Sequence, residues 1–202
     1  MAKKNFVKAS KPDVAELRKA IKNDDLDLVK DLIARGAEVN IKDVDGWTPL
    51  MDACFYGSKD IASLLIAKGA DVNAIDRAEN TALILSAYSG AADIAELLVK
   101  RGAKMDIADN CNNTALILAS FHGHTDVVRV LVENGARLDC KDNEGKTAAD
   151  HIKERGGRGV AAAFAKAKKK REEQILARIK TPATRRPLKI KPPIKFKGAG
   201  NG

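Results

Sequence analysis

Three residues near the middle of the chain have side chains that can bind a metal ion: His122, His124 and Asp126. Imidazole and carboxylate groups are common ligands of zinc and related metals. The 202-residue sequence has no phosphate-binding G-x-x-x-x-G-K-[ST] loop, no G-x-S-x-G turn and no H-E-x-x-H zinc motif. The terminal Gly-Ala-Gly-Asn-Gly is not followed by the helix that phosphate binding requires. The sequence therefore predicts no catalytic residue, and we expect a protein that is not an enzyme and needs no cofactor.

The cysteines give no sign of a disulfide or zinc framework. There are three, Cys54, Cys111 and Cys140, an odd number without a Cys-x-x-Cys pair. No apolar stretch has the length of a membrane span, and the N-terminus has lysines but no apolar core of a signal peptide. These features predict a cytoplasmic protein of a reducing compartment, with a nuclear location open if the organism is eukaryotic.

Positive charge is concentrated near the C-terminus. The chain has 36 Lys and Arg against 27 Asp and Glu, a net charge of +9, and residues 165–202 contain 13 of the basic and two of the acidic residues. Such a segment attracts RNA, DNA or an anionic surface. The candidate polyanion contacts are Lys168, Lys169, Lys170, Arg171, Arg185 and Arg186. A nuclear-import signal over residues 168–171 and simple solubilisation by a disordered end are the alternatives.

The basic segment begins with a predicted helix from Val160 to Lys180. Phe164 is expected to pack on the element before it, and Ile175, Leu176 and Ile179 form a small apolar stripe. Pro182 should end the helix, and the prolines and lysines beyond it favour an extended chain.

The elements before this segment follow a repeat of 33 residues. In the unit that opens at Asp43, an Asp-x-x-Gly turn precedes Thr48, which can cap a helix with a proline in its first position. Gly57 ends that helix, and a second one from Asp60 carries apolar residues at helical spacing up to Gly69. Because neither helix is stable alone, the units must stack to bury their apolar faces. Two residue series keep the step: Gly36, Gly69, Gly102, Gly135 and Thr48, Thr81, Thr114, Thr147.

The units resemble ankyrin repeats. The family's phrase Asp-x-x-Gly-x-Thr-Pro-Leu-His-x-Ala, followed by Gly-Ala-Asp-Val-Asn, is similar to "DVDGWTPLMDA" and "GADVN" in the unit from Asp43, with weaker copies in the next two units. Five units can be placed, beginning near residues 12, 43, 76, 109 and 142. The sequence departs from the family where Met51, Ile84 and Ile117 replace the usual His, so apolar packing should replace a hydrogen-bond network.

The resemblance implies an all-α solenoid of stacked helix-turn-helix pairs with hairpin loops over residues 12–164. A flexible basic N-terminus (1–11) precedes it, and a basic, partly disordered tail (165–202) follows it. The resemblance also places His124 where the family usually has Gly-His between helices, so we expect no metal ion at His124. The sequence around Asn40 and Asn73 is similar to that around ankyrin asparagines that become hydroxylated. The alternative is that these two residues only close the hairpin loop. His151 is expected to face solvent or to pack locally.

In such a solenoid the first helices and the hairpin tips line an inner groove that holds another macromolecule. Phe55, Tyr88 and Phe121 share one register of the first helices and, with Trp47 on a hairpin tip, would form a ladder of anchors for a partner. Alternatively, these rings only fill gaps between the helices, and the residues of the hairpin tips are ordinary solvated loop residues. The predicted partner-binding residues are Trp47, Phe55, Tyr56, Arg77, Asn80, Tyr88, Asn113, Phe121 and His122.

Two functions emerge from these patterns. The first is a non-catalytic, monomeric adaptor that binds a protein partner in the groove. The alternative is a nucleic-acid- or ribosome-associated factor in which the basic tail supplies the affinity and the array presents a second protein.

Overall fold

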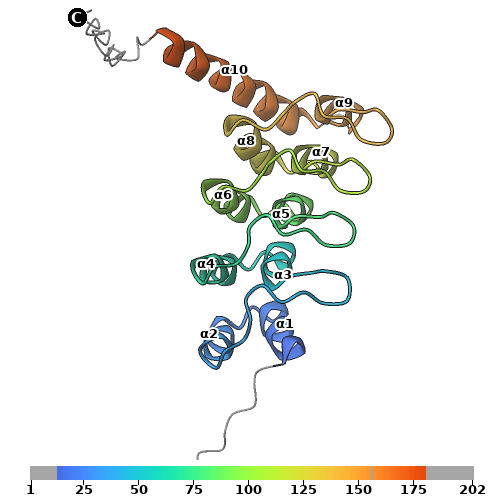
Figure 1. Cartoon of the computed structure of the whole chain (residues 1–202). Helices are drawn as coiled ribbons and strands as arrows, with labels where there is room; N and C mark the ends of the chain where they lie inside the picture. The colour runs from blue at the N-terminus through green and yellow to red at the C-terminus, as the bar shows by residue number, and fades with distance from the viewer. Residues whose placement is uncertain (1–12, 156, 181–202) are drawn as a thin grey trace, which may run out of the picture.

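Paired helices make up most of the structure, a computed structural model that describes residues 13–155 and 157–180. Figure 1 shows them as two columns, with every hairpin loop projecting from the column of first helices. The first helices are α1 (Val14–Lys22), α3 (Pro49–Tyr56), α5 (Ala82–Ser89), α7 (Ala115–His122) and α9 (Ala148–Arg155). The second helices are α2 (Leu26–Ala34), α4 (Lys59–Ala67), α6 (Ala92–Lys100) and α8 (Thr125–Glu133), and α10 (Arg158–Lys180) follows α9. The predicted stack of helix pairs is confirmed.

The helix boundaries arise from the repeated threonines and glycines. The Thr48 hydroxyl caps α3 by accepting a hydrogen bond from the Met51 N–H at 3.3 Å, and the threonines before α5 and α7 do the same. Gly57 ends α3 in the left-handed conformation, with φ near +77°. These limits agree with the sequence prediction, while α4 begins at Lys59, one residue before the predicted Asp60.

The core is continuous along the stack because each pair covers the next. Helix α3 packs on α5, α5 on α7 and α7 on α9, and the second helices pack in the same order. Met51, Ile84 and Ile117 are almost completely buried between the first helices, which confirms that apolar packing fills the places where the ankyrin pattern has His. Leaving one such side chain in water would cost about 1.5–3 kcal/mol, so a single pair lacks the cover that its neighbours provide.

Two asparagines join consecutive units. The Asn40 side chain donates to the Gly69 carbonyl at 3.0 Å and accepts from the Asp71 N–H at 2.8 Å, so it bridges the first and second units. Asn73 makes the matching pair of bonds one unit later, with Gly102 and Lys104. Each asparagine therefore fixes its loop to the next loop along the stack rather than closing its own loop alone.

Helix α10 begins two residues before the predicted Val160 and is much longer than the second helices, with 23 residues against nine in α8. Val160 and Ala167 are buried, and Phe164 packs on the core as predicted. The helix runs without a break across the predicted domain boundary between residues 164 and 165, and its later turns extend past α8 (Figure 1). Ile175 and Leu176 of the predicted stripe are about half exposed, while the side chain of Ile179 and all of Pro182 lie outside the described residues.

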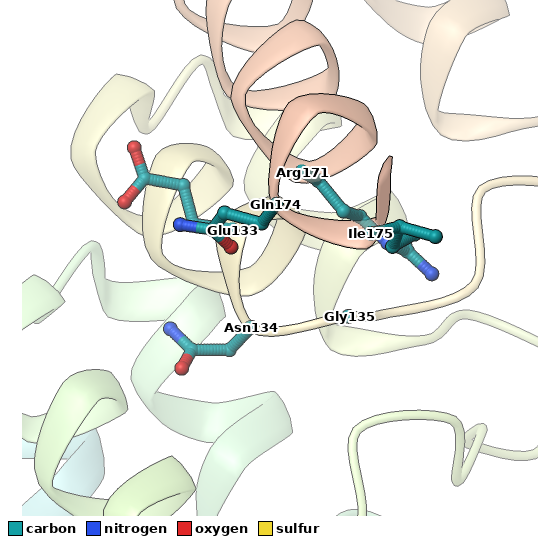
Figure 2. A pocket seen from close by; sticks show the side chains of 6 residues that line it. All are labelled: Glu133, Asn134, Gly135, Arg171, Gln174 and Ile175. Atoms are coloured by element: carbon teal, nitrogen blue, oxygen red, sulfur yellow. The ribbon is translucent and has the colours of Figure 1, made fainter. Parts of the chain in front are cut away.

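The contact between α10 and α8 is polar as well as apolar. Lys170 pairs with Glu133 at 2.8 Å, and the Arg171 guanidinium donates to the Ala136 carbonyl at 2.8 Å. A cation at this place complements the negative end of the α8 dipole. Figure 2 shows Arg171 and Ile175 of α10 above the residues that follow α8, around a hollow of about 460 Å³.

Candidate protein-binding surface

Aromatic rings touch one another along the first helices. Phe55 and Tyr88 of the shared register are in direct contact, whereas Tyr88 reaches Phe121 through the ring of His122. Trp47 meets Phe55 edge-on, with 5.6 Å between ring centroids, and Phe55 stacks on Tyr88 at 6.0 Å. Tyr88 then meets His122 at 4.8 Å, and His122 meets Phe121 at 5.1 Å. These five residues, together with Tyr56 beside Phe55, form what we call the aromatic row. The row crosses the three consecutive units that open at Asp43, Asp76 and Asp109.

The rings of the aromatic row are neither core residues nor free side chains. Tyr56, Tyr88 and Phe121 are 45%, 47% and 43% exposed, while Trp47, Phe55 and His122 are half-buried. The packed half of each ring holds it in place against its neighbours, and aromatic contacts of this kind favour fixed geometry. The row therefore presents a rigid apolar strip to solvent.

At its last unit the row meets Arg155 and His151 of α9, and the Phe121 and His151 rings are edge-on with 5.4 Å between centroids. The Arg155 guanidinium lies 4.8 Å from the centre of the Phe121 ring, an arrangement typical of cation–π contacts. Burial lowers the pKa of His122, and the nearby His124 and Arg155 lower it further because they repel a second positive charge. His122 is consequently neutral at physiological pH and acts as an aromatic ring.

His124 and Asp126 have other partners than a metal ion. The His124 Nε2 lies 3.0 Å from the Tyr88 carbonyl oxygen, and Asp126 pairs with Arg129 at 3.4 Å. Among the residues that the structure describes, no three His, Cys, Asp or Glu side chains are arranged to hold a metal. His124 thus supports the backbone of Tyr88, in the middle of the aromatic row.

The hairpin loops take their shape from the aspartate that opens each unit. In the loop from Asp109, one carboxylate oxygen accepts from the N–H groups of Cys111 and Asn113, both at 2.8 Å. The Asn113 amide donates to the other oxygen at 3.2 Å, and Asn80 does the same for Asp76 at 3.0 Å. The structure thus assigns Asn80 and Asn113, two predicted contact residues, to the support of the loops.

The loop tips are joined to each other by backbone hydrogen bonds. The Arg77 N–H donates to the Asp45 carbonyl at 2.9 Å, and Asn110 bonds Ala78 in the same way at 3.0 Å. The side chain of Arg77 is exposed at its tip. The tips therefore form a connected edge beside the aromatic row rather than a set of independent loops.

An ion-pair cluster between the first two units was not predicted. Arg18 of α1 contacts Asp52 of α3, with 2.8 Å between Nε and Oδ2, and also pairs with Asp43. The Asp52 side chain is only 4% exposed, and burial raises its pKa although Arg18 acts in the opposite direction. The sequence does contain one sign of this cluster: Asp52 is an aspartate at the position where the next two units have Leu85 and Leu118.

His151 lies at the far end of the same register. It is buried, and its Nε2 lies 2.6 Å from an Asp142 carboxylate oxygen, so the expectation that it faces solvent is wrong and local packing is confirmed. Burial acts to raise the pKa of Asp142, but hydrogen bonds from the Lys146 N–H and from His151 outweigh it and lower that pKa.

An apolar hollow of about 270 Å³ lies midway along the aromatic row. Leu85 of α5 and Leu118 of α7 contribute aliphatic walls, and the rings of Phe55 and Tyr88 contribute aromatic ones. Asn80 and Asp109 line it from the hairpin loops. This hollow brings an apolar recess and a carboxylate together on the aromatic row.

The predicted polyanion-binding residues divide into three groups. Lys168 and Lys169 are exposed on α10, and Lys169 lies 3.9 Å from Glu173. Lys170 and Arg171 hold α10 on α8, as described above. Arg185 and Arg186 lie outside the described residues.

The stacked pairs, hairpin loops and aromatic row define a helical repeat protein. A family model of three ankyrin repeats matches residues 17–109, and a second model, of many ankyrin repeats, matches residues 98–152. The chain therefore belongs to the ankyrin-repeat family, whose repeats are generally protein–protein interaction modules. The search of curated proteins returned no match. Within the described residues, no helix combines the length and the apolarity needed to cross a membrane.

Proposed function

We propose that this protein is a non-catalytic adaptor that binds a segment of another protein along the aromatic row and the adjoining hairpin tips. The observation that carries the proposal is that Tyr56, Tyr88 and Phe121 expose nearly half of their surface while their neighbours hold them rigidly. Rigid aromatic side chains are the anchors that protein interfaces favour, because little side-chain entropy is lost on binding. Membership of a family of interaction modules supports the same function.

The proposal is tested by replacing both exposed rings, Tyr88→Ala and Phe121→Ala, in the full chain. Proteins captured on the wild-type chain and on the variant are quantified side by side by mass spectrometry. We expect a partner that binds the row to be lost from the variant, since truncating an interface anchor commonly costs 2 kcal/mol or more, about 30-fold in affinity. The thermal midpoint should fall by only a few degrees, because the rings are about half exposed.

Matched controls come from the second helices. Glu96 and Arg129 are exposed on α6 and α8, so their alanine variants should capture the same proteins as the wild type. If the ring variant lost stability and capture to the same extent, the rings would be packing elements and the adaptor surface would lie elsewhere.

A second function, polyanion binding through the C-terminal region, is favoured by the exposure of Lys168 and Lys169 on a helix that extends beyond the array. Positive charge on a projecting element can approach a phosphate backbone without displacing the repeats. In this function the array would present a protein partner while the basic region holds RNA or DNA.

The salt dependence of RNA and DNA retention tests this second function. Each lysine that contacts a phosphate contributes about one unit to the slope of log K against log salt concentration. The variant Lys168→Ala/Lys169→Ala should therefore lower that slope by about two, whereas Lys59→Ala on α4 should leave it unchanged. Retention that does not depend on salt would exclude the polyanion function.

A further inference from the structure

The aspartates that open the second to fifth units, Asp43, Asp76, Asp109 and Asp142, differ in what their side chains pair with. Asp43 is paired with Arg18, and Asp142 is bonded to His151. The carboxylates of Asp76 and Asp109 instead accept hydrogen bonds from the neutral amides of Asn80 and Asn113. A neutral amide satisfies the geometry of the loop but leaves the negative charge of the carboxylate uncompensated.

Only one of these two central carboxylates lines the hollow. Asp76 is 6% exposed and lies outside the set of lining residues, whereas Asp109 is half-buried and faces the recess with Leu85, Leu118 and Tyr88. An anion at the edge of an apolar recess interacts more strongly with an added cation than one in open water, because the local dielectric constant is lower.

From these contacts we infer that the central hollow recognises a protein segment in which a bulky apolar residue lies next to a lysine or an arginine. The apolar side chain fills the space between Leu85 and Leu118, and the cation pairs with Asp109 at the rim. This inference rests on the proposed function and specifies the chemistry of the partner.

The dimensions of the hollow support a side chain rather than a small molecule. Its volume of about 270 Å³ lies below the range of roughly 300–1,000 Å³ in which most small-molecule sites fall. Phe55 of α3, Leu85 of α5 and Leu118 of α7 all line the hollow. One inserted side chain would therefore touch three consecutive first helices. An acidic partner is disfavoured because Asp109 would repel it.

A library of random peptides displayed on phage is the probe. Selection is carried out on the full chain, and the enriched peptides are synthesised and their affinities measured. We expect enriched sequences to contain Leu, Ile, Met or Phe within a few positions of Lys or Arg.

Two substitutions separate the apolar and the ionic parts of recognition. Leu118→Glu places a charge in the recess and should abolish binding of the selected peptides. Asp109→Asn should weaken binding roughly tenfold, the loss expected for one charge-assisted contact, and should flatten its salt dependence. Asp76→Asn is the matched control for the loop, because Asp76 has the same loop bonds as Asp109 but does not itself line the hollow, so this variant should weaken binding less than Asp109→Asn and leave its salt dependence unchanged.

The outcomes distinguish this inference from the proposed function. If enriched peptides lack a cation, or if Asp109→Asn and Asp76→Asn bind equally, the inference is wrong while the aromatic row can still be the adaptor surface. If the selected peptides bind Leu118→Glu and the Tyr88→Ala/Phe121→Ala variant as tightly as the wild type, both proposals fail. Failure of the library to yield any binding peptide would also count against the inference.

Discussion

Replacing Arg18 with alanine should destabilise the protein by about 3 kcal/mol, because it leaves the buried Asp52 carboxylate without a cation. Removal of one partner from a buried ion pair costs about 3–5 kcal/mol, and the partial exposure of Arg18 argues for the lower end. In a chain of this size such a loss lowers the thermal midpoint by roughly 6–12 °C. Because Arg18 joins the first pair to the second, hydrogen exchange in α1 and α2 should increase before that in the other helices.

The pH dependence of the Arg18→Ala variant provides an independent check. Burial already raises the pKa of Asp52 above its ordinary value of 3.8, and loss of Arg18 removes the interactions that lower it. The folded variant then binds a proton more tightly than the unfolded chain, so its stability rises as the pH falls from neutral toward 3.8. Urea unfolding should therefore show the largest deficit relative to wild type near neutral pH and a smaller one in mild acid.

A double variant controls for the loss of the arginine itself. The register of Asp52 holds Leu85 and Leu118 in the next units, and the place of Arg18 in its unit corresponds to that of Met51. Arg18→Met with Asp52→Leu should therefore recover most of the stability, because apolar residues of similar size commonly replace a buried ion pair without loss. A double variant as unstable as Arg18→Ala would show that burial of the Asp52 charge is not the cause.

Gly90→Ala should destabilise the protein by roughly 3 kcal/mol, from two separate effects. Gly90 ends α5 with φ near +77°, a conformation that costs an alanine about 1–2 kcal/mol. A methyl group there would also lie 2.6 Å from the Nδ1 atom of His124, so the ring must move and its contact with the Tyr88 carbonyl is disturbed. Urea unfolding measures the sum of both effects.

Gly57 offers the matched control for the steric part. It ends α3 with the same φ, but a methyl group there would meet no atom within 4 Å, so Gly57→Ala should cost only about 1–2 kcal/mol. In a His124→Ala background, the added Gly90→Ala change should cost about as much as Gly57→Ala does in the wild type, because the clash with the ring is gone. Equal losses in the two single glycine variants would mean that His124 yields without cost and does not hold Tyr88.

The fold could be predicted in detail because its determinants are local. A threonine cap and a left-handed glycine recur at a fixed step, and each sets a helix end through atoms only a few residues away. The aromatic register followed from the same period, since residues 33 apart must lie side by side once the units stack. The extent to which each ring is exposed did not follow, because it depends on neighbours in two adjacent units.

The interactions that sequence reasoning missed are made across unit boundaries by single, unrepeated side chains. Arg18 and Asp52 are 34 residues apart, and only their departures from the repeated register, where other units have Met51 or Leu85, single them out. Lys170 and Arg171 were assigned to polyanion binding from their charge, although their contacts with α8 become apparent only when α10 is placed. The 33-residue period predicts the features that all units share, whereas these ion pairs and hydrogen bonds are made by residues that occur in one unit only.

The overlap of α10 with α8 also has a consequence for assembly. Stacked modules present an uncovered surface at the last module, and an identical molecule could add there to begin a filament. Here α10 covers that surface at α8, where Lys170 and Arg171 bind it to Glu133 and to the Ala136 carbonyl. Lys168 and Lys169 are exposed on α10 and Ile175 and Leu176 are about half exposed farther along it, so a second molecule added at this end would meet a mixed charged and apolar surface instead of a repeat-shaped one.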